Sequence, residues 1–436
     1  MRFVYNVLFA VFFILSLPYY VFRLWRRGNW QRGFGQRFGL YDAELKERLR
    51  GRKVVWFHAV SVGEVNLCAL LVNALSEHLD DWTVLVSTTT TTGMGELERK
   101  LPSTVCKIYY PVDFLPAVNR ALRIINPELV VLVEAEIWPN LLWRLTDRGT
   151  PTFLVNTRLS DRSARRYAQF RFLFGSIFSS FAGVGVHNEN DAKAVRSVGC
   201  DPNRVRVTGN LKFDAVDLGS RHSVKPAELI AWAGAKDGDL VLLGSSTHPG
   251  EERLLAELFL RLRSSVSNLF LVLVPRHFER GAAVARELDS LGLRSRLRSR
   301  FDSSALASDA VADCLIVDST GELRFFYDVS TVVVIGKSLL AHGGQNPIEA
   351  AAAGCAVVMG PNMENFRAIT KTFLQAESMR QVRGPEGLEA ELLSLLEDQS
   401  LRESLSLRAR AVVDQNRGAV SRTVAMIEPT LNGVSN

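Results

Sequence analysis

A carboxylate follows the first apolar run of the chain. The run covers residues 54–59, and Glu64 lies shortly after it in the segment Ser61-Val62-Gly63-Glu64. Side chains that follow a strand of a parallel sheet lie beside the crevice in which such sheets bind ligands. An ionised carboxylate at that place can accept a proton from an attacking hydroxyl. The spacing alone favours a simpler alternative, in which a first-turn glutamate stabilises its own helix through the helix dipole.

A second acidic pair, Glu134 and Glu136, follows the apolar run 129–133 and precedes a proline. Proline is typical of the first helical position, so the pair should lie between a strand end and a helix start. Either acid fits a role at the crevice, and both remain candidates. A lysine that can neutralise a phosphate or a carboxylate, Lys212, lies in the segment Gly209–Asp214, where an ordinary surface lysine is the simpler alternative.

The second half of the chain has two strand ends that are suited to anion binding. One apolar run ends in Pro275 and is followed by Arg276, whose guanidinium can bind phosphate through two hydrogen bonds. Another run leads into Gly321, Glu322 and Leu323, where a helix start would offer backbone N–H groups to an anion.

A glycine-rich segment, Gly343-Gly344-Gln345-Asn346-Pro347-Ile348-Glu349, is the third candidate in this half. Two glycines followed by an asparagine and a proline are typical of a helix N-terminus that binds phosphate. Glu349 would then accept hydrogen bonds from ribose hydroxyls. Together with Gly360-Pro361 this pattern predicts a nucleotide-sugar site, and the alternative is a plain glycine-rich turn.

The elements that must position these residues form a repetitive pattern. Short runs rich in Val, Ile and Leu alternate with longer amphipathic stretches, which predicts βαβ units around parallel sheets. The predicted strands are 54–59, 83–87, 105–110, 129–133, 152–156, 183–187 and 205–208, then 240–244, 269–274, 314–318, 331–335 and 356–359. Helical patterns fill 386–398 and 401–427.

We therefore predict an α/β protein with two doubly wound, Rossmann-like domains that face a cleft, preceded by an N-terminal hydrophobic helix. Residues 209–238 contain no comparable strand and should hold the domain junction. The predicted parts are an anchor with a basic flank (1–35), a first domain (36–212) and a second domain that includes the C-terminal helices (213–436).

The N-terminal segment Phe3–Phe22 is almost wholly apolar and, at about 20 residues, just long enough to span a bilayer core. Arginines and tryptophans follow it, a combination suited to the headgroup layer. No small-residue cleavage site follows, which disfavours a secretory signal. We expect a membrane anchor that either spans the bilayer or lies in its interface, with residues 23–436 in the cytoplasm. The alternative is a buried helix of the soluble part.

Charge and cysteine content agree with this placement. Residues 1–53 hold 11 lysines and arginines against three acidic residues, whereas the whole chain has a formal charge of +6. A basic surplus at one end argues against a nucleic-acid-binding face and favours contact with anionic lipids, at about 1 kcal/mol per basic residue. The five cysteines are widely spaced, which indicates a reducing compartment rather than a disulfide framework or a thiolate zinc site.

Taken in order, these motifs resemble those of the Kdo transferases of lipopolysaccharide synthesis, and the resemblance runs over essentially the whole chain. It is carried by Ser61–Glu64, Glu134–Asn140, Gly209–Asp214, Pro275–His277, Gly343–Glu349, Gly360-Pro361 and Asn365-Phe366. It implies a GT-B fold and inverting transfer of 3-deoxy-D-manno-octulosonic acid (Kdo) from CMP-Kdo to a glucosamine hydroxyl of a lipid A precursor, lipid IVA. It further implies the cytoplasmic face of a bacterial inner membrane, no nucleic-acid partner, no cofactor and no metal for the transfer.

The resemblance also assigns roles to single residues. Glu64 matches the general base of the family, and Glu134 and Lys212 match positions that support the transition state, with Glu136 as the rival of Glu134. The positions that match CMP contacts are Pro275, Arg276, Gly321, Glu322, Leu323, Asn346, Pro347, Ile348 and Glu349. Gln345 stands where some members have histidine.

Three other functions remain open at this point. A soluble nucleotide-sugar epimerase would share the fold but needs no anchor, which residues 3–37 disfavour. Another nucleotide-sugar-dependent glycolipid glycosyltransferase would share both the fold and the anchor. A non-catalytic, membrane-docked nucleotide-sugar sensor would tolerate the loss of Glu64.

Overall fold

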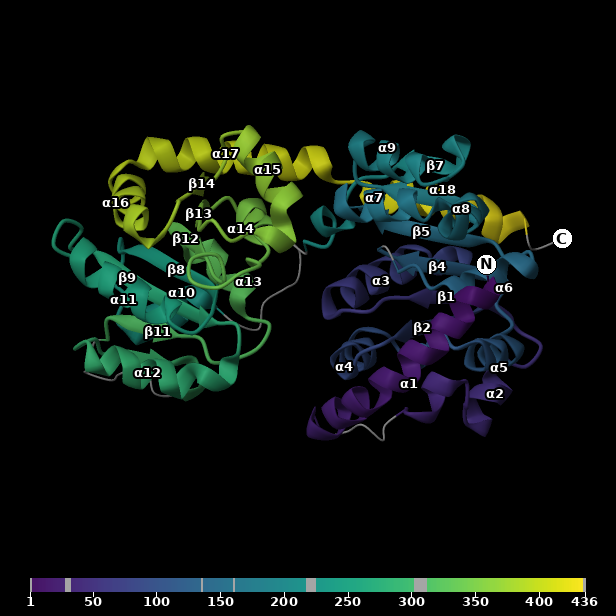
Figure 1. Ribbon diagram of the computed structural model, residues 1–436. Helices are drawn as coiled ribbons and strands as arrows, with labels where there is room; N and C mark the ends of the chain where they lie inside the picture. The colour runs from purple at the N-terminus through teal and green to yellow at the C-terminus, as the bar shows by residue number, and fades with distance from the viewer. Residues whose placement is uncertain are drawn as a thin grey trace. The chain divides into compact units, whose positions relative to one another are not determined.

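The computed structural model describes residues 2–27, 33–134, 136–159, 161–216, 225–301 and 312–433. The chain folds into two compact units (Figure 1). The first unit contains Met1–Ala215 together with Asn416–Asn436, and the second unit contains Val216–Gln415. The division at Ala215 lies inside the junction that the sequence predicts.

In the described part of the first unit, a parallel sheet has seven strands in the order β3-β2-β1-β4-β5-β6-β7. The reversal of strand order beside β1 is the topology of a doubly wound domain, as predicted. Its central strands are buried on both faces, which explains their continuous apolar runs. The strands are β1 (Lys53–His58), β2 (Trp82–Thr88), β3 (Cys106–Tyr109), β4 (Leu129–Val133), β5 (Thr152–Thr157), β6 (Gly183–Val186) and β7 (Val205–Val207).

Helices cover both faces of this sheet (Figure 1). Local signals set their ends: the Ser61 side chain caps α3, Thr90 caps α4, and a proline begins α6. The helices are α1 (Arg2–Arg27), α2 (Ala43–Leu49), α3 (Val62–Ala74), α4 (Thr91–Lys100), α5 (Leu115–Ile125), α6 (Pro139–Asp147), α7 (Asp161–Gln169), α8 (Arg171–Ser180), α9 (Glu189–Ser197) and α18 (Ala419–Gly433).

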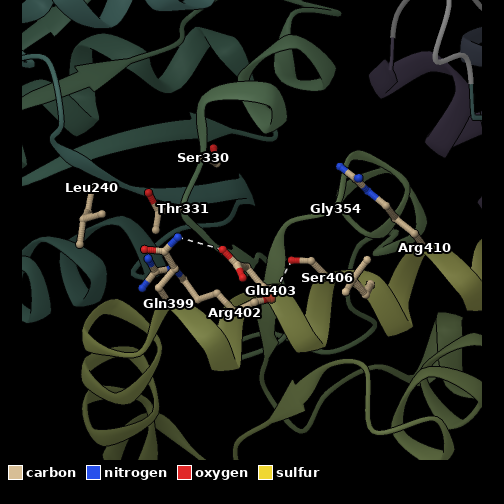
Figure 2. A pocket seen from close by; sticks show the side chains of 10 residues that line it. Leu240, Ser330, Thr331, Gly354, Gln399, Arg402, Glu403, Ser406 and Arg410 are labelled. Atoms are coloured by element: carbon tan, nitrogen blue, oxygen red, sulfur yellow. Dashed lines mark hydrogen bonds between the residues drawn. The ribbon is translucent and has the colours of Figure 1, made fainter.

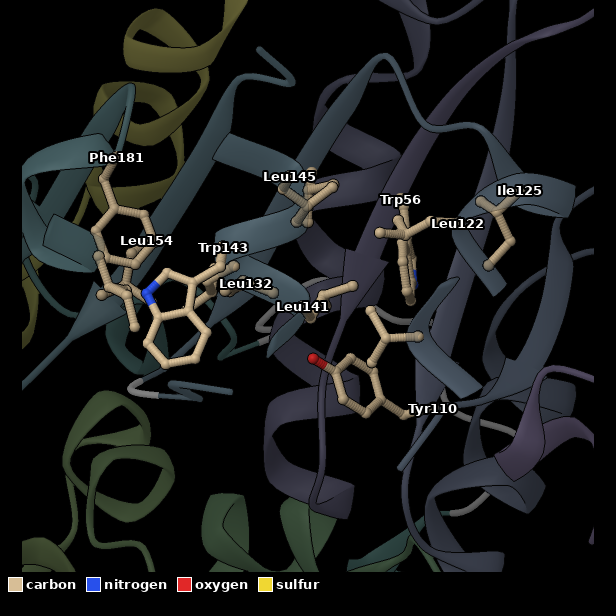
Figure 3. Close-up of a cluster of buried hydrophobic side chains, with 14 of the residues drawn as sticks. Trp56, Tyr110, Leu122, Ile125, Leu132, Leu141, Trp143, Leu145, Leu154 and Phe181 are labelled. Carbon is tan, nitrogen blue, oxygen red and sulfur yellow. The ribbon is translucent and has the colours of Figure 1, made fainter. Parts of the chain in front are cut away.

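The two faces of the sheet hold separate cores. On one face, side chains of β1 and β4 such as Trp56 and Leu132 pack against Leu141 and Trp143 of α6 and Phe181 after α8 (Figure 3). The other face packs against α3, α4 and α18. Burying a side chain of this size contributes about 1.5–3 kcal/mol, so the two cores hold rigid the strand ends that carry the predicted site.

The last helix departs from the sequence prediction. The pattern 401–427 predicts one helix in the second domain, but the structure has α17 (Gln399–Asn416) in the second unit and α18 in the first. Gly418, with φ +83°, lies between them. The Asp214 carboxylate accepts hydrogen bonds from the N–H groups of Gly418 (2.8 Å) and Val420 (2.6 Å), so a residue distant in sequence caps α18.

The described part of the second unit also holds a parallel seven-stranded sheet, in the order β10-β11-β9-β8-β12-β13-β14. The predicted strands are present, and the sequence missed the two edge strands β10 and β14. These are short and polar, and they exist because a neighbouring strand pairs with them. The strands are β8 (Leu240–Thr247), β9 (Leu269–Pro275), β10 (Ser295–Leu297), β11 (Cys314–Ile316), β12 (Val332–Ile335), β13 (Ala356–Met359) and β14 (Arg380–Gln381).

One face of the second sheet packs against α11, α12 and α16, with Phe259 and Leu273 in this core. The predicted helix 386–398 is α16. The helices of this unit are α10 (Pro226–Ala233), α11 (Glu251–Leu262), α12 (Gly281–Ser290), α13 (Leu323–Phe326), α14 (Ile348–Ala353), α15 (Arg367–Gln375), α16 (Leu388–Glu397) and α17.

Helix α1 lies against the first unit through one side. Phe13 stacks on Phe114 with a ring centroid distance of 6.1 Å, and Tyr5 contacts Trp143 edge-on at 5.4 Å. The other side is exposed, with exposed fractions of 65% for Leu8 and 76% for Leu15. Among the residues that the structure describes, no helix combines the length and the apolarity that a membrane span requires.

Candidate active site

Glu64 lies at the carboxyl edge of the first sheet, in the first turn of α3. Its Oε2 accepts a hydrogen bond from the Val60 N–H (2.8 Å) and its Oε1 accepts one from the Ser61 hydroxyl (2.7 Å). The Ser61 hydroxyl in turn accepts a hydrogen bond from the Glu64 N–H (3.3 Å), so the helix-capping alternative is present in the geometry. Each carboxylate oxygen keeps a second lone pair, so the capping contacts leave capacity to accept a proton.

The electrostatic surroundings of Glu64 suit a base. Burial raises the pKa of Glu64, and the hydrogen bonds from Val60 and Ser61 lower it. The nearby carboxylates of Glu134 and Glu136 raise the pKa further. The three acids predicted from the sequence therefore interact at one edge of the sheet. A raised pKa makes the ionised carboxylate more basic, which favours proton abstraction near neutral pH.

Glu134 and Lys212 come together although they lie far apart in the sequence. Glu134 follows β4 with φ +63°, a left-handed conformation that is strained for a residue with a side chain. Its Oε1 lies 3.3 Å from Nζ of Lys212. Glu136 accepts instead a hydrogen bond from the Trp138 indole (2.9 Å), and burial raises its pKa. The contact with Lys212 therefore distinguishes Glu134 from its rival.

Two residues that the sequence did not single out support Lys212. Asn156 lies in β5, next to its last residue, with φ +53°, and its Oδ1 accepts hydrogen bonds from the Leu211 N–H (3.0 Å) and from Nε2 of His187 (2.9 Å). Burial lowers the pKa of His187 to about 3, with the charge of Lys212 acting in the same direction. A neutral His187 can donate to Asn156, which fixes the backbone next to Lys212. The sequence signal for both residues was their place at a strand end.

Asp113 connects the Glu134–Asn140 segment to α1. Its carboxylate is buried and accepts hydrogen bonds from the N–H groups of Asn140 (3.0 Å) and Leu141 (3.0 Å), which begin α6. It also accepts one from the hydroxyl of Tyr5 in α1 (2.8 Å). Asn6 and Asn140 exchange two side-chain hydrogen bonds, of 3.0 and 2.9 Å. The position of α1 and the segment after β4 are thus physically linked.

The stability of the first unit should depend on pH through Asp113. Burial raises the pKa of Asp113 to about 6, against an ordinary value of 3.8. The folded state then holds the proton more tightly than the unfolded state, so this contribution is present below about pH 4 and is lost as pH rises through about 6. We expect the Tm of wild type, relative to that of Asp113→Asn, to be higher at pH 4.5 than at pH 7.5. The corresponding free-energy change is on the order of 1–3 kcal/mol.

Thermal unfolding of both proteins at the two pH values measures this difference. Asp289→Asn, an exposed carboxylate at the end of α12, serves as the control and should leave the pH dependence of wild type unchanged. Equal pH dependence in wild type and Asp113→Asn would contradict the role given to Asp113.

In the second unit, the predicted donor residues follow neighbouring strands of the sheet. Pro275 ends β9 and is buried, whereas Arg276 is exposed and its N–H donates to the Thr247 carbonyl (2.9 Å). Gly321 has φ +79° and Leu323 begins the short α13. Glu322 already forms a two-contact ion pair with Arg298, with both distances 3.1 Å. Arg276 is thus the member of this set with an exposed charged group.

The Gly343–Glu349 segment follows β12. Asn346 Oδ1 accepts a hydrogen bond from the Ile348 N–H (3.1 Å), which orders the turn directly before α14. Pro347 and Ile348 are buried, which leaves their backbone rather than their side chains for a ligand. Glu349 is half-buried at the start of α14. The segment therefore leads into the N-terminus of α14 at the carboxyl edge of the sheet, where the sequence predicts a helix start.

Glu251 connects the loops at this edge of the sheet. It was not predicted from the sequence. Its side chain is only 1% exposed and accepts hydrogen bonds from the N–H groups of His248 (2.9 Å), Lys337 (2.7 Å) and Leu339 (3.2 Å). It thereby ties the loop after β8 to the loop after β12. His248 also contacts the Gln345 amide at 3.2 Å. A signal was available, because two adjacent acids after a glycine follow the predicted strand 240–244.

A cavity of 590 Å³ in this unit lies away from these residues (Figure 2). It is lined by Leu240 and Thr331, at the amino ends of β8 and β12, and by Arg402 and Arg410 of α17. Arg410 donates a hydrogen bond to the Ala353 carbonyl (2.7 Å) at the end of α14. Since parallel sheets bind ligands at the opposite, carboxyl edge, we assign this cavity a structural role.

Comparison with known proteins gives a consistent result. The family model for 3-deoxy-D-manno-octulosonic-acid transferase (kdotransferase) matches residues 32–215. The 3-deoxy-D-manno-octulosonic acid transferase of Bordetella pertussis is 33% identical over 427 residues, covering 94% of this chain and 95% of that protein. The transferase of the same name from Haemophilus influenzae is 28% identical over 404 residues, covering 92% of each.

Among solved structures, UDP-GlcNAc 2-epimerase from Neisseria meningitidis matches with a TM-score of 0.58 and 14% identity, over 87% of this chain and 100% of that one. At this identity the likeness describes the fold alone. The near-complete match to the Bordetella transferase decides the family: the chain belongs to the 3-deoxy-D-manno-octulosonic acid transferases and is a glycosyltransferase.

Proposed function

We propose that the chain transfers Kdo from CMP-Kdo to a glucosamine hydroxyl of a lipid A precursor, lipid IVA, with inversion at the anomeric carbon. The observation that carries this proposal is the Glu64 carboxylate, which is buried beside Glu134 at the carboxyl edge of the first sheet and has a raised pKa. A base of this kind is what a hydroxyl acceptor needs, because the hydroxyl oxygen becomes a good nucleophile as it loses its proton.

In the proposed step, Glu64 takes the proton as the acceptor oxygen bonds to the anomeric carbon of Kdo. The bond between that carbon and the phosphate oxygen breaks, and its electron pair leaves with CMP. Lys212 offers a positive charge near the reacting groups, and its ion pair with Glu134 fixes the ammonium group in place. Such fixed charges stabilise the transition state without reorganising.

We further propose that the second unit binds CMP-Kdo through Arg276, Gly321–Leu323 and Asn346–Glu349. The exposed guanidinium of Arg276 supports this assignment, since two hydrogen bonds to phosphate are its preferred geometry. The side chains of Pro275, Pro347 and Ile348 are buried, so these residues would shape the turn and contact the nucleotide through backbone atoms.

Incubation of the purified protein with CMP-Kdo and tetra-acylated lipid A precursor tests the proposal. Mass spectrometry of the lipid is expected to show the addition of Kdo, together with release of CMP. An unchanged lipid mass, under conditions in which the Bordetella pertussis enzyme modifies the same lipid, would reject it. Release of free sugar without a glycolipid product would favour the epimerase alternative.

We also propose that α1 holds the enzyme on the cytoplasmic face of the bacterial inner membrane. The exposed side of α1 includes Leu8, Phe12 and Leu15, which lie one helical turn apart along one stripe. The other side is tied to the first unit, for example by the ion pair between Arg2 and Asp147 (2.7 Å). These contacts support a helix that lies along the interface, with its apolar stripe among the lipid chains.

Substituting glutamate for Leu8, Phe12 and Leu15 together is expected to weaken binding to liposomes of anionic phospholipid at least about tenfold. The reason is that burying each of these side chains contributes about 1.5–3 kcal/mol. Cosedimentation measures the bound fraction. Leu407→Glu, at a leucine of α17 that is 68% exposed, is the matched control and should bind like wild type. Undiminished cosedimentation of the triple variant would contradict the assignment.

A further inference from the structure

Lys337 lies just after Gly336, which follows β12, at the carboxyl edge of the second sheet, and it has a backbone conformation that few lysines adopt. Its φ is +58°, in the left-handed region. There the Cβ atom of an L residue crowds the neighbouring backbone, whereas glycine has no Cβ and adopts the conformation freely. Strained residues of this kind gather at ligand sites, where the side chain has a use.

Both peptide groups of Lys337 are held in place. Its N–H donates to Oε2 of the buried Glu251 (2.7 Å), and its carbonyl accepts a hydrogen bond from the Gly344 N–H (3.1 Å). The preceding Gly336 packs so closely that a Cβ built on it would lie 2.2 Å from the Ser246 carbonyl oxygen. The fold therefore determines the backbone of Lys337 and the direction in which its side chain leaves.

The ammonium group lies beside the glycine turn of the predicted donor site. A Cβ built on Gly343 would lie 3.4 Å from Nζ of Lys337. Within the described part of the chain, Nζ of Lys337 has no hydrogen bond or ion pair with a protein group. Burial lowers the pKa of the neighbouring His248; the charge of Glu251 opposes this shift, and the charge of Lys337 acts in the same direction as burial. Lys337 is thus a positively charged residue in a corner that also contains the carboxylates of Glu251 and Glu364, both of which accept backbone hydrogen bonds.

We propose that Lys337 is a donor-binding residue whose ammonium group pairs with an anionic oxygen of the nucleotide sugar, on its phosphate or on the carboxylate of the sugar. The inference rests on the proposed function, because an anionic donor is what gives the ammonium group a partner. Lys337 would add a positive charge to the turn formed by Gly343–Glu349, whose own contribution is mainly backbone. The strained backbone of Lys337 would then serve ligand binding and not the stability of the fold.

Isothermal titration of CMP and of CMP-Kdo, without acceptor, tests this inference in three variants. Lys337→Met removes the charge and keeps the apolar stem, and we expect Kd to rise about 10- to 100-fold, as for a lost hydrogen bond to a charged group. Lys337→Gly should weaken binding equally while leaving Tm unchanged or higher, since glycine relieves the strain. Lys337→Arg keeps the charge and should lose least. Weaker binding of CMP would show that Lys337 contacts the phosphate, whereas weaker binding of CMP-Kdo alone would show that it contacts the sugar carboxylate.

The matched control is Glu377→Gly. Glu377 also has a left-handed backbone, with φ +49°, but it follows α15 and precedes β14, at the amino edge of the same sheet. This variant should, like Lys337→Gly, have an unchanged or higher Tm, and it should bind both ligands like wild type. Wild-type Kd values in Lys337→Met and Lys337→Gly, or an equal loss in Glu377→Gly, would overturn the inference alone. Wild-type protein that binds neither ligand would overturn the proposed function with it.

Discussion

Glu64→Gln is expected to lower kcat for Kdo transfer by about 10²–10⁴-fold, the usual cost of removing a general base. The substitution separates the two roles that the geometry allows. Glutamine serves as well as glutamate in a capping box: its amide oxygen can accept from the Val60 N–H while its NH2 group donates to the Ser61 hydroxyl oxygen. The glutamine amide cannot, however, take the proton from the hydroxyl of the lipid acceptor. A glutamate that only caps α3 would therefore leave Glu64→Gln with nearly normal turnover and a normal Tm.

The pH dependence gives a second measurement of the same group. The base acts only when ionised, and burial raises the pKa of Glu64 above its ordinary value of 4.5. Activity should therefore fall on the acid side at a higher pH than an ordinary glutamate would give, and this limb should vanish in Glu64→Gln. Ser61→Ala is the control: it keeps the carboxylate and removes one hydrogen bond that lowers its pKa, so the acid limb should move to still higher pH. If activity falls at the same acid pH in wild type and in Ser61→Ala, Glu64 is not the group that causes the fall.

Lys212→Met is expected to lower kcat by about 10²–10³-fold, as for other fixed groups that stabilise developing charge. Nζ of Lys212 lies 3.3 Å from Glu134, and the Leu211 backbone beside it is fixed by Asn156. If the lysine acts on the reacting groups, Glu134→Gln should cost less than Lys212→Met. The double variant should then be no worse than Lys212→Met, because Glu134 acts through the lysine.

Steady-state kinetics with CMP-Kdo and the lipid acceptor give kcat and KM for all three variants. Lys225→Met is the matched control, since Lys225 forms an exposed ion pair of 2.6 Å with Glu228 outside the site. This control should keep wild-type kcat. A loss in Glu134→Gln as large as in Lys212→Met, with the two losses multiplying in the double variant, would refute the proposed order of action.

The sequence predicted most strands because burial on both faces of a parallel sheet demands continuous apolar runs. The run 129–133 coincides with β4, whereas Ser295–Leu297 and Arg380–Gln381 gave no signal. These edge strands bury little, so pairing with a neighbour creates them and composition does not. The break before α18 was missed for a related reason. Its cap is Asp214, about 200 residues earlier in the chain, and no local pattern contains that information.

The same distinction between local and long-range information applies to the candidate site. The order of apolar runs and polar ends, by itself, placed Glu64, Glu134 and Arg276 at the carboxyl edges of two parallel sheets, whereas it placed Lys212 only in the segment between the two domains. Only the tertiary structure decided that Lys212 contacts Glu134 while Glu136 contacts Trp138, and that Lys337 has a left-handed backbone beside Gly343. The physical reason is the range of the interactions. A strand's ends follow from local burial, whereas the partner of an end-of-strand side chain depends on strand order and on crossovers that link distant residues.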